Sequence, residues 1–324
     1  MKRLVIISLV VLAMIVTGSV AVAQKGTVVY YSSGGAKVAK AVVKAFGKEY
    51  PDITVEHIIG GTGELTNRIK AEKDNPRGDV FRAAVEAFYS FPELFASYKT
   101  KQDASFARTL VGKNHEFYAY STAIQLFIVN TDMLPEAEAP KSWKALGDPK
   151  YKSKIIMAHP AVSGSAFRQI AQMVHLHGWD LVAKVVDNTS FVPKSRLVYT
   201  NVAKGEYAIG VTEESKPYRM AKDGYPTIAV YPEEGVAMSY GAVGLIKNGP
   251  NPENARLLAD FINSKEGHQL AVKVENRRSP RADVPAPKVM PPTSDIKFFD
   301  FDEEKAAQNR DEILKKFEEL YGKK

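Results

Sequence analysis

Apolar residues alternate along most of the chain between short continuous runs and runs at helical spacing. Residues 27–31 and 53–59 have the pattern of buried strands, and between them Val38, Val42 and Phe46 recur on one face of a helix. The same order of strand, small-residue turn and helix returns in the middle of the chain. This alternation predicts α/β architecture with mostly parallel sheets.

Two longer apolar stretches, 117–130 and 238–246, enclose a segment with strand and helix patterns of its own. We interpret both as strands that cross between two lobes, which makes the first lobe discontinuous in sequence. Residues 280–294 hold five prolines and predict a strap, and 302–321 predicts a final helix. The expected parts are a signal peptide at 1–23, a first lobe of 24–122 and 242–285, a second lobe of 123–241, and a strap with C-terminal helix at 286–324.

The first residues have the pattern of an export signal. Lys2 and Arg3 precede an apolar run at 4–16, and Ala21-Val22-Ala23 has the small-x-small sequence that signal peptidase cleaves. The apolar run has 13 residues, whereas a spanning helix needs about 20. No cysteine follows the run, which excludes a lipid anchor. We therefore expect an exported, soluble mature chain that begins at Gln24.

Composition is that of a soluble globular protein, because 45% of the residues are apolar and 25% are charged. This excludes a disordered chain, a fibrous repeat and a polytopic membrane protein. The 44 basic and 37 acidic residues are scattered, which predicts a mildly basic surface that binds no nucleic acid. The tightest basic cluster, Arg277, Arg278 and Arg281, is interpreted as part of that surface. The sequence has no cysteine, which excludes disulfides, thiolate metal sites and thiol nucleophiles.

Three turns rich in serine, threonine and glycine follow predicted strands and open predicted helices. A helix N-terminus has unpaired N–H groups and a partial positive charge, glycine lets a ligand approach the backbone, and hydroxyls add donors. Several such turns that converge make an anion site, although any one of them alone is better explained as a helix cap. The candidate residues are Ser32, Ser33, Gly34, Thr62, Gly63, Ser163, Gly164 and Ser165.

Motifs for catalysis and nucleotide binding are missing from the sequence. The turn at 61–63 lacks the third glycine of the dinucleotide fingerprint, and there is neither a P-loop nor a GxSxG elbow. The histidines show no metal-ligand spacing. The adjacent carboxylates Glu213 and Glu214 point apart and have no accompanying nucleophile, so we expect them to accept hydrogen bonds from hydroxyls or an amine. The sequence thus predicts no catalytic residue, no metal ligand and no cofactor.

Several short motifs together are similar to one known family. They include Val28-Val29-Tyr30-Tyr31-Ser32, Gly61-Thr62-Gly63-Glu64-Leu65, Pro140-Lys141-Ser142-Trp143, Lys247-Asn248-Gly249-Pro250 and Ser279-Pro280-Arg281. In this order and spacing, the chain resembles the solute-binding proteins of bacterial ABC importers, in the branch that holds ferric-ion, phosphonate and phosphorylated-sugar binders. The resemblance covers nearly the whole mature chain. It implies a two-lobed periplasmic binding protein fold of type II, hinged by two crossing strands.

The same resemblance implies a non-enzymatic role. Such a protein is expected in the periplasm as a monomer that captures a small anionic solute between its lobes. It would deliver this solute to a cognate ABC permease in the inner membrane.

The resemblance also bears on the ligand. Ferric-ion binders of this branch carry a tyrosine pair where this sequence has Thr212-Glu213-Glu214-Ser215, so an organophosphate, sugar phosphate or phosphonate is implied instead. The three turns would hold the phosphoryl oxygens, and Glu213 would accept hydrogen bonds from sugar hydroxyls or an amine. Tyr199 and Tyr240 are candidate walls of the site, with a packing role equally open. The alternatives are a ferric-ion receptor with a synergistic anion and, ranked last, a secreted phosphate-ester hydrolase.

Overall fold

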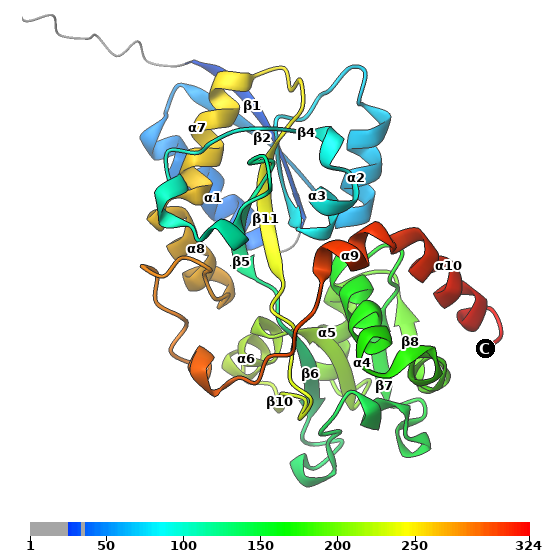
Figure 1. The fold of residues 1–324 in the computed structure, drawn as a ribbon. Helices are drawn as coiled ribbons and strands as arrows, with labels where there is room; N and C mark the ends of the chain where they lie inside the picture. Colours follow the sequence, from blue (N-terminus) through cyan, green and yellow to red (C-terminus); the bar gives the residue numbers. More distant parts are fainter. Residues whose placement is uncertain (1–24, 34–35) are drawn as a thin grey trace, which may run out of the picture.

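The computed structural model describes residues 25–33 and 36–324, which form two lobes with one β-sheet each (Figure 1). The predicted signal peptide lies outside the described residues. The first-lobe sheet contains β1 (Gly26–Ser33), β2 (Ile53–Gly60), β3 (Val80–Ala84), β4 (Phe95–Ala96), β5 (Tyr118–Thr122) and β11 (Tyr240–Ile246). The second-lobe sheet contains β6 (Gln125–Asn130), β7 (Ile155–Ala158), β8 (Thr189–Val192), β9 (Ile209–Glu213) and β10 (Thr227–Val230). The predicted two-lobed α/β class is confirmed.

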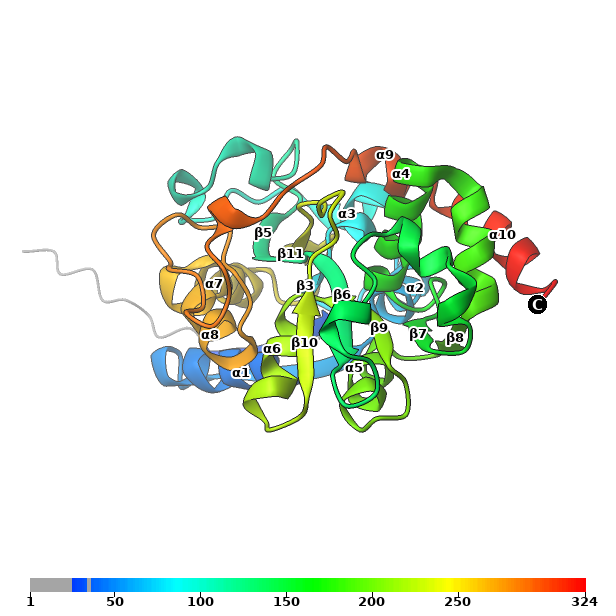
Figure 2. The ribbon, with the colours of Figure 1, turned by 90° about the horizontal axis from the view of Figure 1, so that it is seen from below.

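Each sheet combines parallel and antiparallel strands. In the first lobe the order is β2-β1-β3-β11-β4, where β1 is parallel to β2 and β3, while β11 runs antiparallel and also pairs with β5. In the second lobe the strands lie side by side in the order β10-β6-β9-β7-β8 (Figure 2). Strands β7, β8 and β9 are parallel, whereas β6 is antiparallel to both of its neighbours. The carboxyl ends of the parallel strands therefore share one edge in each lobe.

Helices cover both faces of each sheet. In the first lobe, α1 (Ala36–Glu49), α7 (Pro252–Asn263) and α8 (Lys265–Glu275) pack on one face, and α2 (Thr62–Ala71) and α3 (Glu86–Ser90) on the other. Adjacent residues of β1 enter the two cores, because Tyr30 faces α1 and Tyr31 faces α2. In the second lobe, α4 (Gly164–Asn188) packs opposite α5 (Ser195–Ala203) and α6 (Ser215–Lys222). Short 3-10 turns lie at Pro92–Leu94, Asp103–Ser105, Arg108–Leu110, Glu136–Glu138, Lys144–Gly147, Pro149–Tyr151 and Thr293–Asp295.

The expected helix at 302–321 is two helices, α9 (Glu303–Gln308) and α10 (Arg310–Tyr321), with a break at Asn309. The break has a tertiary cause, since α9 packs on α3 of the first lobe and α10 on α4 of the second. The chain has to change direction between the two helices so that α9 can contact the first lobe and α10 the second. Docking through α10 is confirmed, because Phe317 is fully buried in the second-lobe core.

Three segments of the chain meet where the lobes join. The expected strand at 117–130 is divided into β5 and β6, which belong to different sheets and are separated only by Ala123 and Ile124. Residues 231–239 make the second crossing, and the strap runs beside them. The prediction that the strand at 238–246 itself crosses was wrong, because this strand is β11 and pairs only within the first-lobe sheet. Ile124, Val236 and Ile296, one from each segment, share a small buried cluster. The strap is thus a third connection beside the two predicted ones, and the predicted domain boundaries stay a prediction.

Candidate functional site

Polar residues at the ends of β1 and β3 and at the start of α2 lie together in the first lobe. Thr62 Oγ1 donates a hydrogen bond to Ser33 Oγ at 2.9 Å. Ser32 is buried, and its Oγ lies 2.7 Å from Nε2 of His57. Arg82 donates from Nη2 to the Ser33 carbonyl at 3.2 Å. The sequence singled out these hydroxyls but not His57 or Arg82, which only the pairing of β1 with β2 and β3 brings beside them.

The histidine at this strand end is neutral near pH 7. Burial lowers the pKa of His57 to about 4, and the charges of Arg82 and Lys40 add to this effect. The same two charges would attract an anion placed beside them. Gly34, the glycine that the sequence adds to this turn, lies outside the described residues.

The second-lobe turn opens α4, as the sequence predicts. Ser163 is the residue before the helix, and its Oγ accepts a hydrogen bond from the backbone N–H of Ala166 at 3.3 Å. It also lies 3.1 Å from Ser165 Oγ. Ser163 therefore caps the helix, and its contact with a ligand stays a prediction. Both hydroxyls stand at the N-terminus of a helix, where an anion is favoured.

The two turns face each other across the lobe interface. A Cβ atom built on Gly61 would lie 3.0 Å from the carbonyl oxygen of Val162. One built on Gly63 would lie 3.2 Å from the carbonyl oxygen of Ala161. The start of α2 thus touches the segment directly before Ser163. The structure brings together two of the turns that the sequence placed a hundred residues apart.

Glycine at position 164 also serves the contact between lobes. A Cβ atom on Gly164 would overlap Oε1 of Glu86 and lie 3.1 Å from the Cβ of Ala84. Both neighbours belong to the first lobe. The sequence predicts that a ligand approaches the backbone at Gly164, whereas in the structure the first lobe lies against this position. Contact between a ligand and Gly164 stays a prediction.

Glu213 is held by two cations. Its Oε2 lies 2.9 Å from Lys216 Nζ and 2.5 Å from Arg277 Nη2. Burial would raise the pKa of Glu213, but the charges of Arg277 and Lys216 outweigh burial and lower the pKa to about 2. Glu213 is therefore ionised and already paired with two cations, and its predicted role as an acceptor for ligand hydroxyls or an amine stays a prediction. Lys216 lies three residues further along the chain, a spacing that signals such a pair.

The neighbouring carboxylate, Glu214, is held by hydrogen bonds from an arginine and a tyrosine. Glu214 accepts hydrogen bonds from Nε and Nη2 of Arg278 at 2.9 and 3.0 Å, and from the Tyr231 hydroxyl at 2.5 Å. Arg278 and Arg281 are only 3% and 4% exposed. The interpretation of the basic cluster as surface was therefore wrong for these two residues. Both guanidinium groups pair with a carboxylate and donate to a backbone carbonyl, and these partners compensate for the loss of water on burial.

The two candidate wall tyrosines lie on different elements. Tyr199 of α5 is buried beside the Glu213 pair, with Lys216 Nζ 6.0 Å and Arg219 Cζ 4.8 Å from its ring centroid. Tyr240 begins β11, and its carbonyl accepts a hydrogen bond from Arg168 Nη2 at 2.8 Å. Burial raises the pKa of Tyr240. Both side chains pack, and their role as walls of a ligand site stays a prediction.

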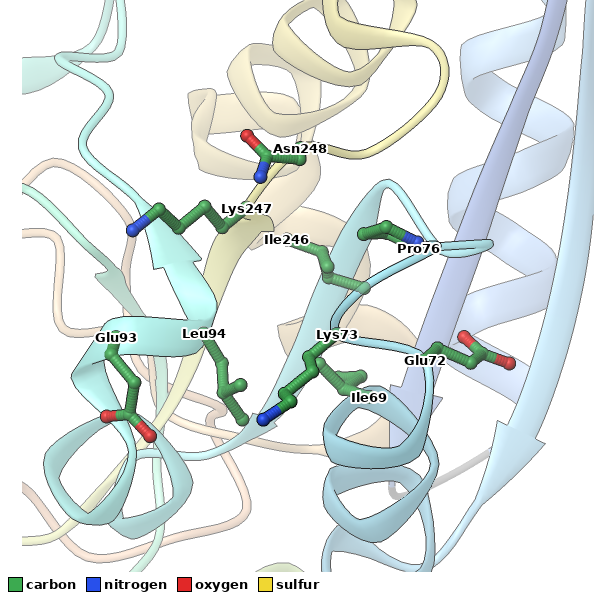
Figure 3. Close-up of a pocket in the computed structure, with 9 residues that line it drawn as sticks. All are labelled: Ile69, Glu72, Lys73, Pro76, Glu93, Leu94, Ile246, Lys247 and Asn248. Carbon is green, nitrogen blue, oxygen red and sulfur yellow. The ribbon is translucent and has the colours of Figure 1, made fainter.

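Two surface cavities of the described residues lie in the first lobe, at the end of α2 opposite Thr62. The smaller holds about 50 Å³ between Ile69, Lys73, Leu94 and Lys247 (Figure 3). That volume takes one or two water molecules, whereas small-molecule sites take about 300 Å³ or more. The larger is an open groove over β1 and β2. Residues of the three turns line neither cavity.

Residues 27–273 match the bacterial extracellular solute-binding proteins. The chain belongs to this family. This solute-binding protein is 32% identical over 264 residues to an uncharacterized protein of Haemophilus influenzae, a match that covers 77% of this chain and 76% of that one. It is 25% identical over 256 residues to a Salmonella paratyphi A periplasmic protein with a proposed 2-aminoethylphosphonate-binding role, covering 72% and 71% of the two chains.

Among solved structures, this solute-binding protein is similar to the periplasmic binding protein AfuA of Actinobacillus pleuropneumoniae with fructose 6-phosphate bound. The TM-score is 0.84 at 26% identity, with 93% of this chain and 98% of AfuA covered. The resemblance seen in the sequence is thereby confirmed. The family, the Salmonella relative and AfuA are binding proteins that serve transport outside the cytoplasm.

Two kinds of feature are absent from the described residues. None of their helices has the length and apolarity that a membrane-crossing helix needs. Nor do they bring three His, Cys, Asp or Glu side chains together as a metal site would.

Proposed function

We propose that this protein is the substrate-binding component of an ABC importer and captures a small organic phosphate, sugar phosphate or phosphonate between its lobes. The observation that carries the proposal is the meeting of two hydroxyl-bearing turns from opposite lobes. Thr62 and Ser33 stand on one side and Ser163 and Ser165 on the other, with Gly61 and Val162 in contact between them. The ligands named for AfuA and for the Salmonella relative support this choice.

The binding mode follows from the helix ends. Helices α2 and α4 begin at the two turns, and the first turn of a helix carries N–H groups that have no partner within the helix, together with a partial positive charge. A phosphoryl group between them would accept hydrogen bonds from these N–H groups and from the hydroxyls. The ligand is bound and released unchanged, so the protein acts as a receptor and not as an enzyme.

The proposed cellular role has three parts. The signal peptide directs the chain to the periplasm, where the mature monomer works. Its two lobes close on the anionic solute. An ABC permease in the inner membrane then receives the solute from the protein.

Isothermal titration of the mature chain tests the proposal. Fructose 6-phosphate should bind with a measurable Kd, and fructose, which lacks the phosphoryl group, should not. Native mass spectrometry of the protein as purified should show a retained ligand mass. The proposal fails if a panel of sugar phosphates and phosphonates produces no heat, if inorganic phosphate is released from them, or if ferric citrate binds instead with a visible charge-transfer band.

A further inference from the structure

We propose that α9 (Glu303–Gln308) is a latch that moves with the second lobe and docks on α3 of the first lobe when the lobes close. Opening then separates α9 from α3, whereas α10 stays packed on α4. The inference rests on the proposed closure of the two lobes and adds the part that the C-terminal helices take in it. It does not depend on which anion is bound.

The two C-terminal helices contact different lobes. Helix α9 packs on α3 of the first lobe, and α10 packs on α4 of the second (Figure 1). A single residue, Asn309, separates α9 from α10. Lobes that move apart must therefore break one of these two contacts or bend the chain at Asn309.

The contact of α10 with the second lobe is apolar. Phe317 is fully buried in the second-lobe core, and its ring packs edge-on against Phe191 of β8 with the centroids 5.2 Å apart. Ile313 and Leu320 pack against the same core. Burial of large apolar side chains is the main stabilising contribution in folded proteins, so this contact should persist when the lobes open.

The contact of α9 with the first lobe is held by polar groups. The Ser90 hydroxyl at the end of α3 donates to the carbonyl of Ala307 at 2.9 Å, and Lys113 pairs with Glu304 at 2.7 Å. The side chain of Lys113 is 79% exposed, and pairs at the surface contribute little to stability. The buried residue of α9 is Ala307, whose side chain is a single methyl group. The attachment of α9 is therefore the weaker of the two and the one that opening should break.

The two carboxylates around Arg168 fit this motion. Glu303 belongs to α9 and Arg168 to α4, so their pair at 2.7 Å moves as one with the second lobe. Glu86 belongs to the first lobe, and its Oε2 can pair with Arg168 only while the lobes touch. Its other oxygen, Oε1, is buried and accepts no hydrogen bond from the described residues. Opening therefore leaves a neutral Arg168–Glu303 pair in the second lobe and returns Glu86 to water, which can satisfy both of its oxygens.

The remaining contacts of this cluster lie close to the pivot. Ser239 donates to Glu303, and the Tyr240 carbonyl accepts from Arg168. These two residues end the crossing segment and begin β11, where the chain passes from one lobe to the other. Atoms near a pivot are displaced least in a hinge motion, so both contacts are compatible with an open form.

A single thiol reports whether α9 leaves the first lobe, because the chain has no cysteine of its own. Ala307→Cys places a thiol at the contact with α3. Ala271→Cys is the matched control in the first-lobe core, and both alanines are 1% exposed. In the ligand-free protein, Ala307→Cys should react with a maleimide roughly tenfold or more faster than Ala271→Cys, because opening a contact takes less free energy than unfolding a core. Saturating fructose 6-phosphate should slow the reaction of Ala307→Cys alone.

Two reversible crosslinks decide which helix moves. Lys113→Cys with Glu304→Cys joins α9 to the first lobe, and His159→Cys with Glu318→Cys joins α10 to the second, at pairs whose wild-type side chains lie 2.7 and 3.3 Å apart. A short bis-methanethiosulfonate forms each bridge and dithiothreitol removes it, so each variant is compared with its own reduced form. The α9 bridge should lower the radius of gyration of the ligand-free protein and slow dissociation of fructose 6-phosphate roughly tenfold or more. The α10 bridge should change neither quantity.

The outcomes separate this inference from the proposed function. Equal labelling rates of the two thiols in the ligand-free protein overturn the inference. An α9 bridge without effect also overturns it, and so does an α10 bridge that prevents opening, because α10 would then be the helix that leaves its lobe. If no phosphate or phosphonate binds, the proposed function fails, while the labelling rates and the ligand-free radius still decide whether α9 is a latch.

Discussion

Arg168 of α4 donates a hydrogen bond from Nη2 to Glu86 Oε2 of α3 at 2.7 Å, and both side chains are at least 96% buried. This ion pair ties the second lobe to the first. The same guanidinium donates from Nε to Glu303 of α9 at 2.7 Å, and Ser239 in the second crossing donates to the same carboxylate at 2.7 Å. Two lobes, a crossing segment and the C-terminal helix pair therefore meet at one cation.

Replacing this cation should be costly. Arg168→Met leaves Glu86 and Glu303 buried without a counter-charge, so we expect the free energy of unfolding to fall by about 3–5 kcal/mol. Urea denaturation measures the loss. Arg256→Met is the matched control, because its pair with Glu253 is exposed and should contribute less than about 1 kcal/mol.

A second variant separates charge from packing. If uncompensated charge causes the loss, adding Glu86→Gln and Glu303→Gln to Arg168→Met should recover a large part of the stability. No recovery would show that the loss comes from packing alone. A loss as small as that of Arg256→Met would show that the pair does not hold the lobes together.

Two serines that cap helices provide a paired test of ligand contact. Ser163 accepts from Ala166 N at 3.3 Å, and Ser264 accepts from Gly267 N at 3.1 Å at the start of α8. Either serine replaced by alanine should lose about 0.5–2 kcal/mol of stability. Only Ser163→Ala should also weaken fructose 6-phosphate binding, by roughly tenfold to a hundredfold, since a hydrogen bond to a charged oxygen contributes about 1.5–3 kcal/mol. Equal Kd values for both variants would mean that Ser163 is a cap only.

Closure of the lobes should depend on Gly164. Small-angle scattering of the wild type should show a smaller radius of gyration with saturating fructose 6-phosphate than without it. In Gly164→Ala the added methyl overlaps Glu86, so the radius should stay at the larger value and affinity should fall. Gly47→Ala is the control, because nothing lies near its Cβ position and alanine stabilises a helix by up to about 1 kcal/mol. Ligand-induced compaction of Gly164→Ala equal to that of wild type would refute this role.

Acid should remove the stability that Glu213 contributes. Its pKa is about 2 in the folded protein against an ordinary value of 4.5. The folded state therefore favours the ionised form, and the contribution is complete above pH 4.5 and is lost as the pH falls toward 2. Denaturant unfolding between pH 5 and pH 2.5 should be less steep in pH for Glu213→Gln than for wild type. An unchanged slope would contradict the pairing.

Glu303 should act with the opposite sign. Burial raises its pKa above 4.5, although Arg168 lowers it in part. A raised folded-state pKa means that its contribution is present at low pH and lost as the pH rises through that value. Glu303→Gln should therefore gain stability relative to wild type as the pH rises from 4.5 through the folded-state pKa. A relative loss over that range would show that the ionised form is favoured after all.

Local patterns predicted much of the fold and part of the site. The strand and helix order, the cap at Ser163 and the turn at Thr62 all depend on residues within one or two helical turns of each other. The spacing of Glu213 and Lys216 is also local, but their pairing was not predicted. The division of 117–130 into two strands was not predicted, because its apolar pattern is continuous and only the sheets decide which part belongs to which.

By itself, the sequence determined the family, the α/β order of elements and the positions of the hydroxyl-bearing turns. Periodicity and turn composition are short-range properties, and they can be recognised without knowledge of the packing. Only the tertiary structure decided which charges pair. Glu213 with Arg277 and Glu86 with Arg168 join residues 64 and 82 positions apart, and Arg168 reaches Glu303 across a further 135. Such pairs form because two lobes bury them against each other, and no local pattern encodes that contact.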